Sequence, residues 1–157
     1  MKIQFWSVGK PHEPYAKAGI EEFTKRINNY FTVDWHIIPP PKNATNLSET
    51  DLKKAEAVII LQQVQKDDYL ILLDERGKQP GSPELAQWIQ QRANESTKRF
   101  IFLIGGAFGV DETVMKRADQ SWSLSKLVFP HMLVRLILAE QVYRACTILR
   151  NEKYHHS

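Results

Sequence analysis

Residues 100–144 read FIFLIGGAFGVDETVMKRADQSWSLSKLVFPHMLVRLILAEQVYR, and this stretch decides the fold. An apolar run over 100–104 ends in the pair Gly105-Gly106, and a second short run over 122–124 leads into Pro130 and a long apolar segment. Glycines at the end of a strand let main-chain groups approach a ligand closely, because no Cβ intervenes. Such strand ends are where helix-covered sheets bind small molecules. The stretch therefore predicts one pocket that is built from several loops.

The remainder of the chain alternates strand-like and helix-like segments. The strands are expected at 2–8, 33–38, 69–73, 100–104 and 122–125. The helices are expected at 14–30, 48–64, 82–94, 111–118 and 130–151, with Ser48 and Ser82 as N-caps. No break in composition interrupts this alternation. It predicts a single α/β domain over residues 1–157, with a mostly parallel sheet covered by helices on both faces.

Three strand ends are expected to converge, at 73–77, 105–109 and 124–129. Backbone donors and acceptors between aliphatic side chains suit a flat adenine with polar edges. A dinucleotide site is disfavoured, because the glycines read G-G-x-x-G and lie late in the chain. The segment 77–82, GKQPGS, is not a phosphate-binding P-loop. One cysteine and scattered histidines predict no metal site.

Composition bears on compartment and partner. The single cysteine, Cys146, excludes an internal disulfide, fits a reducing cytoplasm, and reads as a buried, inert thiol. No charged and apolar leader and no membrane-spanning run are recognised, so we expect a cytoplasmic protein. Residues 1–97 hold 12 Lys and Arg against 13 Asp and Glu, whereas residues 98–157 hold 9 against 5. A basic half around a ligand site suits RNA, although an ordinary solvated surface explains the charge equally well.

The last helix bears on assembly. Between residues 132 and 149 its polar positions are Arg135, Glu140, Gln141, Arg144 and Thr147. A helix on the outside of a small domain needs an apolar stripe of little more than about 100°. This helix is therefore expected to bury two faces, one on its own sheet and one in a homodimer. The alternative is a helix central to a monomer, which is harder to arrange at the end of the chain.

Several motifs together resemble one protein family. They are LIGG at 103–106, WSLSKLVFPH at 122–131, LVR at 133–135 and EQVYRA at 140–145, and the likeness extends from MKIQFWSVGK at the start to KYHH at the end. The family is that of the bacterial SPOUT-class methyltransferases that modify ring nitrogen 3 of a pseudouridine in 23S ribosomal RNA. The resemblance implies S-adenosyl-L-methionine as cofactor, a homodimer, and a trefoil knot formed by about residues 70–157. It places the cofactor at Leu73, Gly105, Leu124, Ser125, Lys126, Leu127, Val128 and Phe129.

Four residues are candidates for the chemistry. Methylation at nitrogen 3 requires that an imide proton leaves and that the resulting anion is stabilised. Arg135 lies one helical turn beyond His131 and is expected at the lip of the pocket, where it stabilises this anion, binds phosphate, or forms a structural ion pair. His131 acts as base, caps the helix, or contacts RNA. Tyr154 and His155 are ordinary terminal residues unless, as the resemblance implies, they cover the partner's pocket.

The function expected from these observations is methyl transfer from S-adenosyl-L-methionine to 23S ribosomal RNA, on the assembled ribosome. Two alternatives stay open at this point. The first is a non-catalytic ribosome-binding protein of the same fold, and the second is a SPOUT methyltransferase that acts on tRNA.

Overall fold

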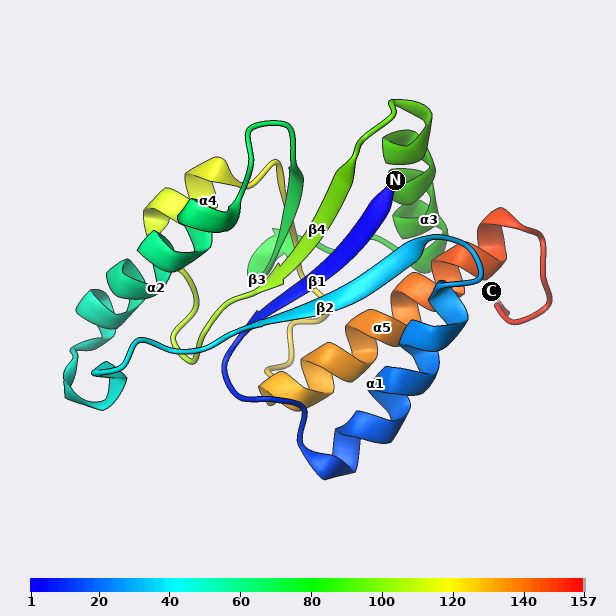
Figure 1. Cartoon of the computed structure of the whole chain (residues 1–157). Helices are drawn as coiled ribbons and strands as arrows, with labels where there is room; N and C mark the ends of the chain where they lie inside the picture. Colours follow the sequence, from blue (N-terminus) through cyan, green and yellow to red (C-terminus); the bar gives the residue numbers. More distant parts are fainter. Residues whose placement is uncertain (157) are drawn as a thin grey trace.

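The computed structural model describes residues 1–156 and is organised around one five-stranded sheet (Figure 1). The strands are β1 (Lys2–Val8), β2 (Thr32–Ile38), β3 (Tyr69–Lys78), β4 (Arg99–Ile104) and β5 (Gln120–Trp122), in the spatial order β2-β1-β4-β3-β5. All four neighbouring pairs are parallel. The predicted parallel sheet is confirmed, and all five strands end at the same edge.

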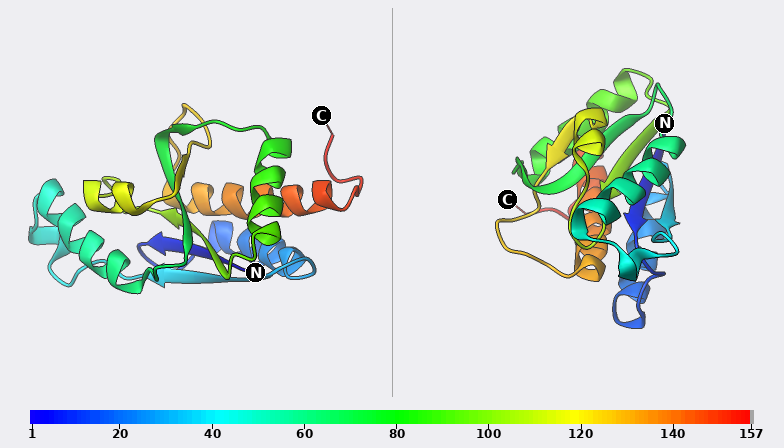
Figure 2. Two further views of the ribbon diagram at one scale, coloured as in Figure 1. Left: turned by 90° about the horizontal axis from the view of Figure 1, so that it is seen from above. Right: turned by 90° about the vertical axis from the view of Figure 1, so that its left-hand side faces the viewer.

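Helices cover both faces of this sheet (Figure 2). One face carries α1 (Pro14–Ile27), α3 (Ser82–Asn94) and α5 (His131–Leu149), and the other carries α2 (Glu49–Gln63) and α4 (Glu112–Arg117). A short 3-10 helix, Ala44–Asn46, precedes α2. The predicted N-cap of α2 is confirmed, because the Ser48 side chain accepts a hydrogen bond from the Asp51 N–H.

The apolar run of β4 shows why two helical layers form. Phe100 and Phe102 point into the core beneath α1, α3 and α5, whereas Ile101 and Leu103 point into the core beneath α2 and α4. All four side chains are fully buried. Since successive side chains of a strand face opposite sides, a strand that is apolar throughout must be covered twice. Full burial of each such side chain contributes about 1.5–3 kcal/mol.

Strand β3 corrects one prediction. The strand was expected to end at residue 73 and to be followed by a turn at residues 74–77, but β3 stays extended to Lys78. Its second half returns to β5 after an irregular register, with Lys78 paired to Trp122 and the Ser123 N–H bonded to the Lys78 carbonyl. Between these paired segments the Arg76 backbone N–H has no partner on β5, and it donates instead to the Asp74 carboxylate. Gly77 had been interpreted as part of a turn, but pairing with the distant strand β5 keeps this segment extended.

Two further boundaries differ because of contacts between distant residues. Strand β5 begins two residues and ends three residues earlier than predicted, since the Asp119 N–H already pairs with the Leu70 carbonyl. Helix α3 begins at Ser82 itself, with Gly81 as its N-cap. The Ser82 hydroxyl donates a hydrogen bond to the Gln141 side chain of α5 at 2.7 Å, and Ser82 is already inside the helix instead of preceding it.

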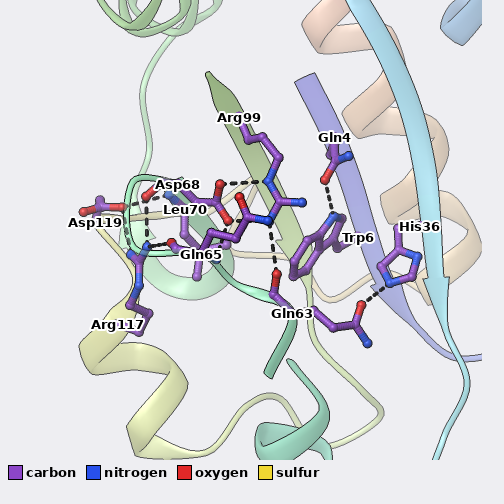
Figure 3. A network of polar contacts seen from close by, with 10 residues as sticks. All are labelled: Gln4, Trp6, His36, Gln63, Gln65, Asp68, Leu70, Arg99, Arg117 and Asp119. Carbon is purple, nitrogen blue, oxygen red and sulfur yellow. Dashed lines mark hydrogen bonds and ion pairs between the residues drawn. The ribbon is translucent and has the colours of Figure 1, made fainter. Parts of the chain in front are cut away.

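A polar network closes the amino edge of the sheet (Figure 3). Arg99, at the start of β4, donates two hydrogen bonds to the Asp68 carboxylate and one to the Gln63 carbonyl. Arg117, at the end of α4, pairs with Asp119, whose carboxylate accepts the Leu70 N–H. These bonds tie the beginnings of β3, β4 and β5 together.

The position of α5 corrects the argument about its two apolar faces. Helix α5 packs on the sheet and against both α1 and α3, so it is the central helix of its layer. Gly19 of α1 allows this approach, because a Cβ there would lie 2.7 Å from Leu136. The arrangement that was judged hard to build at a chain terminus is the one observed. The apolar circumference of α5 by itself therefore does not require a partner.

Candidate functional site

A cavity of about 600 Å³ opens at the carboxyl edge of the sheet, beside the ends of β3, β4 and β5. Its walls are residues 73–76, residues 104–110 and most of residues 122–129. The expected convergence of three strand ends in one pocket is confirmed. The volume lies in the range of about 300–1,000 Å³ that is usual for small-molecule and cofactor sites.

The loop after β4 forms a narrow, backbone-lined wall. The Gly109 N–H bonds the Gly106 carbonyl at 3.1 Å, and Gly109 has a φ of +85°, a conformation that favours glycine. A Cβ on Gly105 would lie 2.7 Å from Val110 and 3.2 Å from the Gly109 backbone. The loop therefore needs glycine for its own folding, and it leaves main-chain groups next to the cavity.

The loop after β5 leaves the sheet through two serine contacts. The Ser123 hydroxyl donates to the Ser125 carbonyl, and the Leu127 N–H donates to the Ser125 hydroxyl, both at 3.0 Å. Beyond this turn the side chains of Leu127 and Val128 line the cavity and are nevertheless 70% and 82% exposed. Two aliphatic side chains at the mouth of a cavity provide a surface for a ligand or a neighbouring molecule.

Most of the predicted cofactor residues meet at this cavity. Its lining includes Leu73, Gly105, Leu124, Ser125, Leu127, Val128 and Phe129. Lys126 is exposed and does not belong to the lining. Their contact with a cofactor stays a prediction.

His131 begins α5 and lies in the cavity wall. Burial lowers the pKa of its imidazole, and the charge of Arg135 lowers it further, while a hydrogen bond with the Gly106 backbone partly offsets both effects. The ring is therefore held in its neutral form near pH 7. A neutral imidazole accepts a proton or a hydrogen bond, which keeps the predicted role of base open.

Arg135 is brought near His131 but does not line the cavity. Its side chain is fully buried and turns toward the end of β1, where Nε donates to the Ser7 hydroxyl at 2.9 Å. Nη1 contacts His12 Nδ1 at 3.2 Å and the Met132 sulfur at 3.6 Å. Burial lowers the pKa of the guanidinium, and Glu13 opposes this at longer range. Among residues 1–156 no carboxylate forms an ion pair with Arg135, so the ion-pair alternative is wrong.

Tyr154 and His155 follow the end of α5, whereas His131 stands at its start. Figure 1 shows the C-terminal segment beside the far end of α5. The Tyr154 hydroxyl donates to Glu140, and His155 contacts Arg144, which also stacks on the Tyr154 ring. A 19-residue helix spans about 28 Å, so neither side chain reaches the cavity of its own chain. Within one chain they are structural, and any catalytic role requires a second copy.

Several cavity residues were not among the predicted cofactor residues, although residues 74–76 belong to a strand end that was expected at the pocket. Lys53 enters the lining from α2, and Asp74, Glu75 and Arg76 enter it from the extended end of β3. The Arg76 guanidinium donates to both oxygens of Asp74 at 3.0 Å and holds the pKa of that carboxyl below its usual value. Phe108 also lines the cavity and is half exposed. Only the position of 74–76 at a strand end gave a signal for this group.

Two absences concern the described part of the chain. In residues 1–156 no group of three or more His, Cys, Asp or Glu is arranged to hold a metal ion. None of the helices formed by these residues is both long and apolar enough to cross a bilayer. Cys146 is buried as predicted, and desolvation raises the pKa of its thiol to about 12.

Comparison with known proteins gives the family. A model of the family described as "Predicted SPOUT methyltransferase" matches residues 1–155. The ribosomal RNA large subunit methyltransferase H of Cytophaga hutchinsonii is 47% identical over 156 residues, which cover 99% of this chain and all of the relative. The protein of the same name from Christiangramia forsetii is 45% identical, with 99% of both chains covered.

The fold is also found among solved structures. A crystal structure of a protein described as belonging to a methylase family, from Neisseria gonorrhoeae, superposes with a TM-score of 0.53 at 13% identity, over 99% of this chain and 85% of the other. At this identity the likeness concerns the fold alone. The full-length match to the family model and the near-half identity to full-length relatives decide the assignment, and this chain belongs to the SPOUT methyltransferase family.

Proposed function

We propose that this protein transfers the methyl group of S-adenosyl-L-methionine to nitrogen 3 of a pseudouridine in large-subunit ribosomal RNA. The observation that carries the proposal is the glycine-walled cavity at the carboxyl edge of the sheet, in a chain whose full-length relatives are named ribosomal RNA large subunit methyltransferase H. The pseudouridine and its nitrogen 3 come from the family resemblance described above.

The lining of the cavity fits this cofactor. Gly105 and Gly106 offer backbone groups to the polar edge of an adenine, and Leu73, Leu124 and Phe129 offer apolar surface to its faces. When bound, the cofactor supplies an electrophilic methyl group on a sulfonium, so the reaction calls for no metal. What the chain supplies is alignment of the nucleophile, which can lower a barrier by several kcal/mol.

The residues near the start of α5 suit the removal of the imide proton. His131 lies in the cavity wall with a lowered pKa, so its neutral ring is available to accept a proton. Arg135 does not line the cavity, but it adds a buried positive charge close enough to act on His131, and no carboxylate of the described residues neutralises this charge. A cation in a poorly solvated site stabilises an anion strongly, and a deprotonated uracil ring is such an anion.

We further propose that the active form is a homodimer in which the tail of one chain completes the cavity of the other. Tyr154 and His155 lie beyond the far end of α5 and cannot reach their own cavity. Exposed apolar side chains of Leu127, Val128 and Leu133 surround the cavity mouth and the first turn of α5. An antiparallel pair of α5 helices brings the tail of each chain to this region of its partner.

The activity is tested on ribosomes from a strain that lacks the protein. The purified protein and labelled S-adenosyl-L-methionine are added to intact ribosomes, to free ribosomal RNA and to tRNA, and the methylated nucleoside is identified by mass spectrometry. We expect 3-methylpseudouridine in the large-subunit RNA of the intact ribosomes. Cofactor binding without methylation of any RNA favours a binding protein of the same fold. Label in tRNA alone favours a tRNA enzyme.

The shared site is tested by mixing two inactive variants. One is Arg135→Met, and the other is truncated after Lys153 and so lacks Tyr154 and His155. In a mixed dimer one of the two cavities combines an intact Arg135 with an intact tail, so mixing restores up to about a quarter of the activity. The proposal fails if mass spectrometry detects mixed dimers that remain inactive. It fails equally if the protein sediments as a monomer at full activity.

A further inference from the structure

Glu56 of α2 is an acidic side chain buried directly behind the glycine wall of the cavity. Its side chain is only 6% exposed. Its two carboxylate oxygens lie 2.5 and 2.6 Å from the point where a Cβ on Gly106 would sit. Gly106 itself lines the cavity. A single glycine residue therefore separates the carboxylate from the space in which a ligand binds.

This carboxylate lacks the partners that buried charges normally have. Within residues 1–156 no lysine, arginine or histidine forms an ion pair with it, and no donor hydrogen-bonds to it. Desolvation alone raises the pKa of the Glu56 carboxyl. Buried acids are as a rule paired, because an unpaired one destabilises the fold. An unpaired acid next to a cavity is a candidate for recognition of a charged ligand.

The other carboxylates of the cavity are less able to attract a cation. Asp74 is already neutralised by the two hydrogen bonds from Arg76. Glu75 is exposed, so water and salt screen its charge. Glu56 is only 6% exposed, so water and salt screen its charge less than they screen that of Glu75. It is the acidic group at this cavity whose field reaches a ligand with least screening.

Helix α2 also presents the opposite charge near the same cavity. Lys53 lies one turn before Glu56 and belongs to the cavity lining. The two residues therefore offer a positive and a negative group next to each other. The methionine end of S-adenosyl-L-methionine carries a sulfonium, an ammonium and a carboxylate. Its positive groups match Glu56 and its carboxylate matches Lys53.

We propose that Glu56 is a specificity-determining residue that acts across Gly106 and selects the positive charge at the methionine end of the cofactor. The inference rests on the proposed function, because it takes S-adenosyl-L-methionine as the ligand. Glu56 would contribute through a long-range electrostatic interaction, which requires no direct contact with the cofactor. Unit charges separated by one residue in poorly solvated protein change an affinity by about 10-fold or more.

The test compares three ligands that share an adenosine and a sulfur. S-adenosyl-L-methionine carries the sulfonium and the ammonium, S-adenosylhomocysteine keeps only the ammonium, and 5′-methylthioadenosine has neither charge. Their dissociation constants are measured by calorimetry for the unsubstituted protein, for Glu56→Gln and for Glu56→Met. Glu49→Gln is the matched control, because it removes the same charge from an exposed position of the same helix.

We expect Glu56→Gln to raise the dissociation constant of S-adenosyl-L-methionine by about 10-fold or more. The dissociation constant of 5′-methylthioadenosine should change by less than about twofold. If only S-adenosyl-L-methionine loses affinity, Glu56 recognises the sulfonium. If S-adenosylhomocysteine loses affinity equally, Glu56 recognises the ammonium. Equal losses for all three ligands indicate structural damage and overturn the inference, as does no loss for any. Glu56→Met, which is also uncharged but has no polar atoms, must reproduce the pattern.

The outcome also separates this inference from the proposed function. If the unsubstituted protein binds none of the three ligands, the proposed function fails and the inference fails with it. If it binds S-adenosyl-L-methionine and methylates ribosomal RNA, but the two Glu56 variants keep its ligand preference, only the inference is wrong.

Discussion

Gly77→Ala tests how the extended end of β3 supports the cavity. A Cβ at this position would lie 2.6 Å from the Ser121 carbonyl carbon and 2.7 Å from the Trp122 nitrogen. Both atoms belong to the backbone of β5, so no side-chain rotation relieves the clash. The strands must separate by about 0.8 Å to restore ordinary van der Waals contact, which begins at 3.4 Å.

The expected cost follows from this geometry. Overpacking a well-packed site costs about 1–3 kcal/mol, and immovable neighbours place this case at the upper end. In a chain of this length each kcal/mol lowers the melting temperature by about 2–4 °C, so a decrease of roughly 5–10 °C is expected. The loop after β5 contributes much of the cavity wall, and its displacement also weakens cofactor binding by about 10-fold.

The measurement pairs calorimetric melting with titration of S-adenosyl-L-methionine. Gly81→Ala is the control, because a Cβ at Gly81 meets only Pro83 at 3.7 Å, an ordinary contact. The control is expected to melt within about 2 °C of the unsubstituted protein, since helix-cap and chain-entropy effects of opposite sign nearly cancel. If Gly77→Ala melts and binds like the control, the reasoning about β3 and β5 is refuted.

Three further predictions concern single residues. Arg135→Met should lower methyl transfer at least about 100-fold and leave the dissociation constant of S-adenosyl-L-methionine within several-fold, and undiminished transfer would remove Arg135 from the chemistry. Gly105→Val should abolish measurable cofactor binding in calorimetry, since its first carbon already meets Val110 at 2.7 Å, and normal binding would mean that the cavity is not the cofactor site. For Asp68, burial would raise the pKa, but hydrogen bonds from Arg99 and from the Gln65 N–H outweigh it and the pKa is lowered. A carboxyl whose pKa is lowered in the folded state stabilises the fold above about pH 4, and this stabilisation is lost as the pH falls through the folded-state pKa. Asp68→Asn should therefore cost about 2–3 kcal/mol at pH 7 in urea unfolding and less at pH 3. An equal cost at both pH values would contradict the ion pair.

The parts of the fold that were predicted correctly depend on local patterns. The run at 100–104 is apolar on both faces, which by itself requires a strand covered twice. Ser48 caps a helix because its partner, the Asp51 N–H, is three residues away. Gly105 marks a strand end because the glycine requirement arises within the same loop. In each case the cause and the effect lie close together in the chain.

The wrong predictions depend on partners far along the chain. The Ser82 hydroxyl bonds Gln141, and no pattern near residue 82 announces this. Helical spacing placed Arg135 on the side of His131, but its long side chain reaches away to Ser7 of β1. Glu56 was not singled out from the sequence, because its segment KKAEA looks like a solvated helix face, and its burial follows from the packing of α2 behind Gly106. Such contacts are determined by the assembled fold.

The network of Figure 3 has a consequence for how this molecule can change over generations. Its ion pairs and hydrogen bonds join the strands where they begin, whereas the turns that line the cavity lie where the strands end. Because these two edges are separated by the length of the strands, substitutions in the network are expected to change thermal stability without altering the cavity. An organism that adapts to a warmer or colder habitat could therefore change the thermal stability of this protein through the network alone.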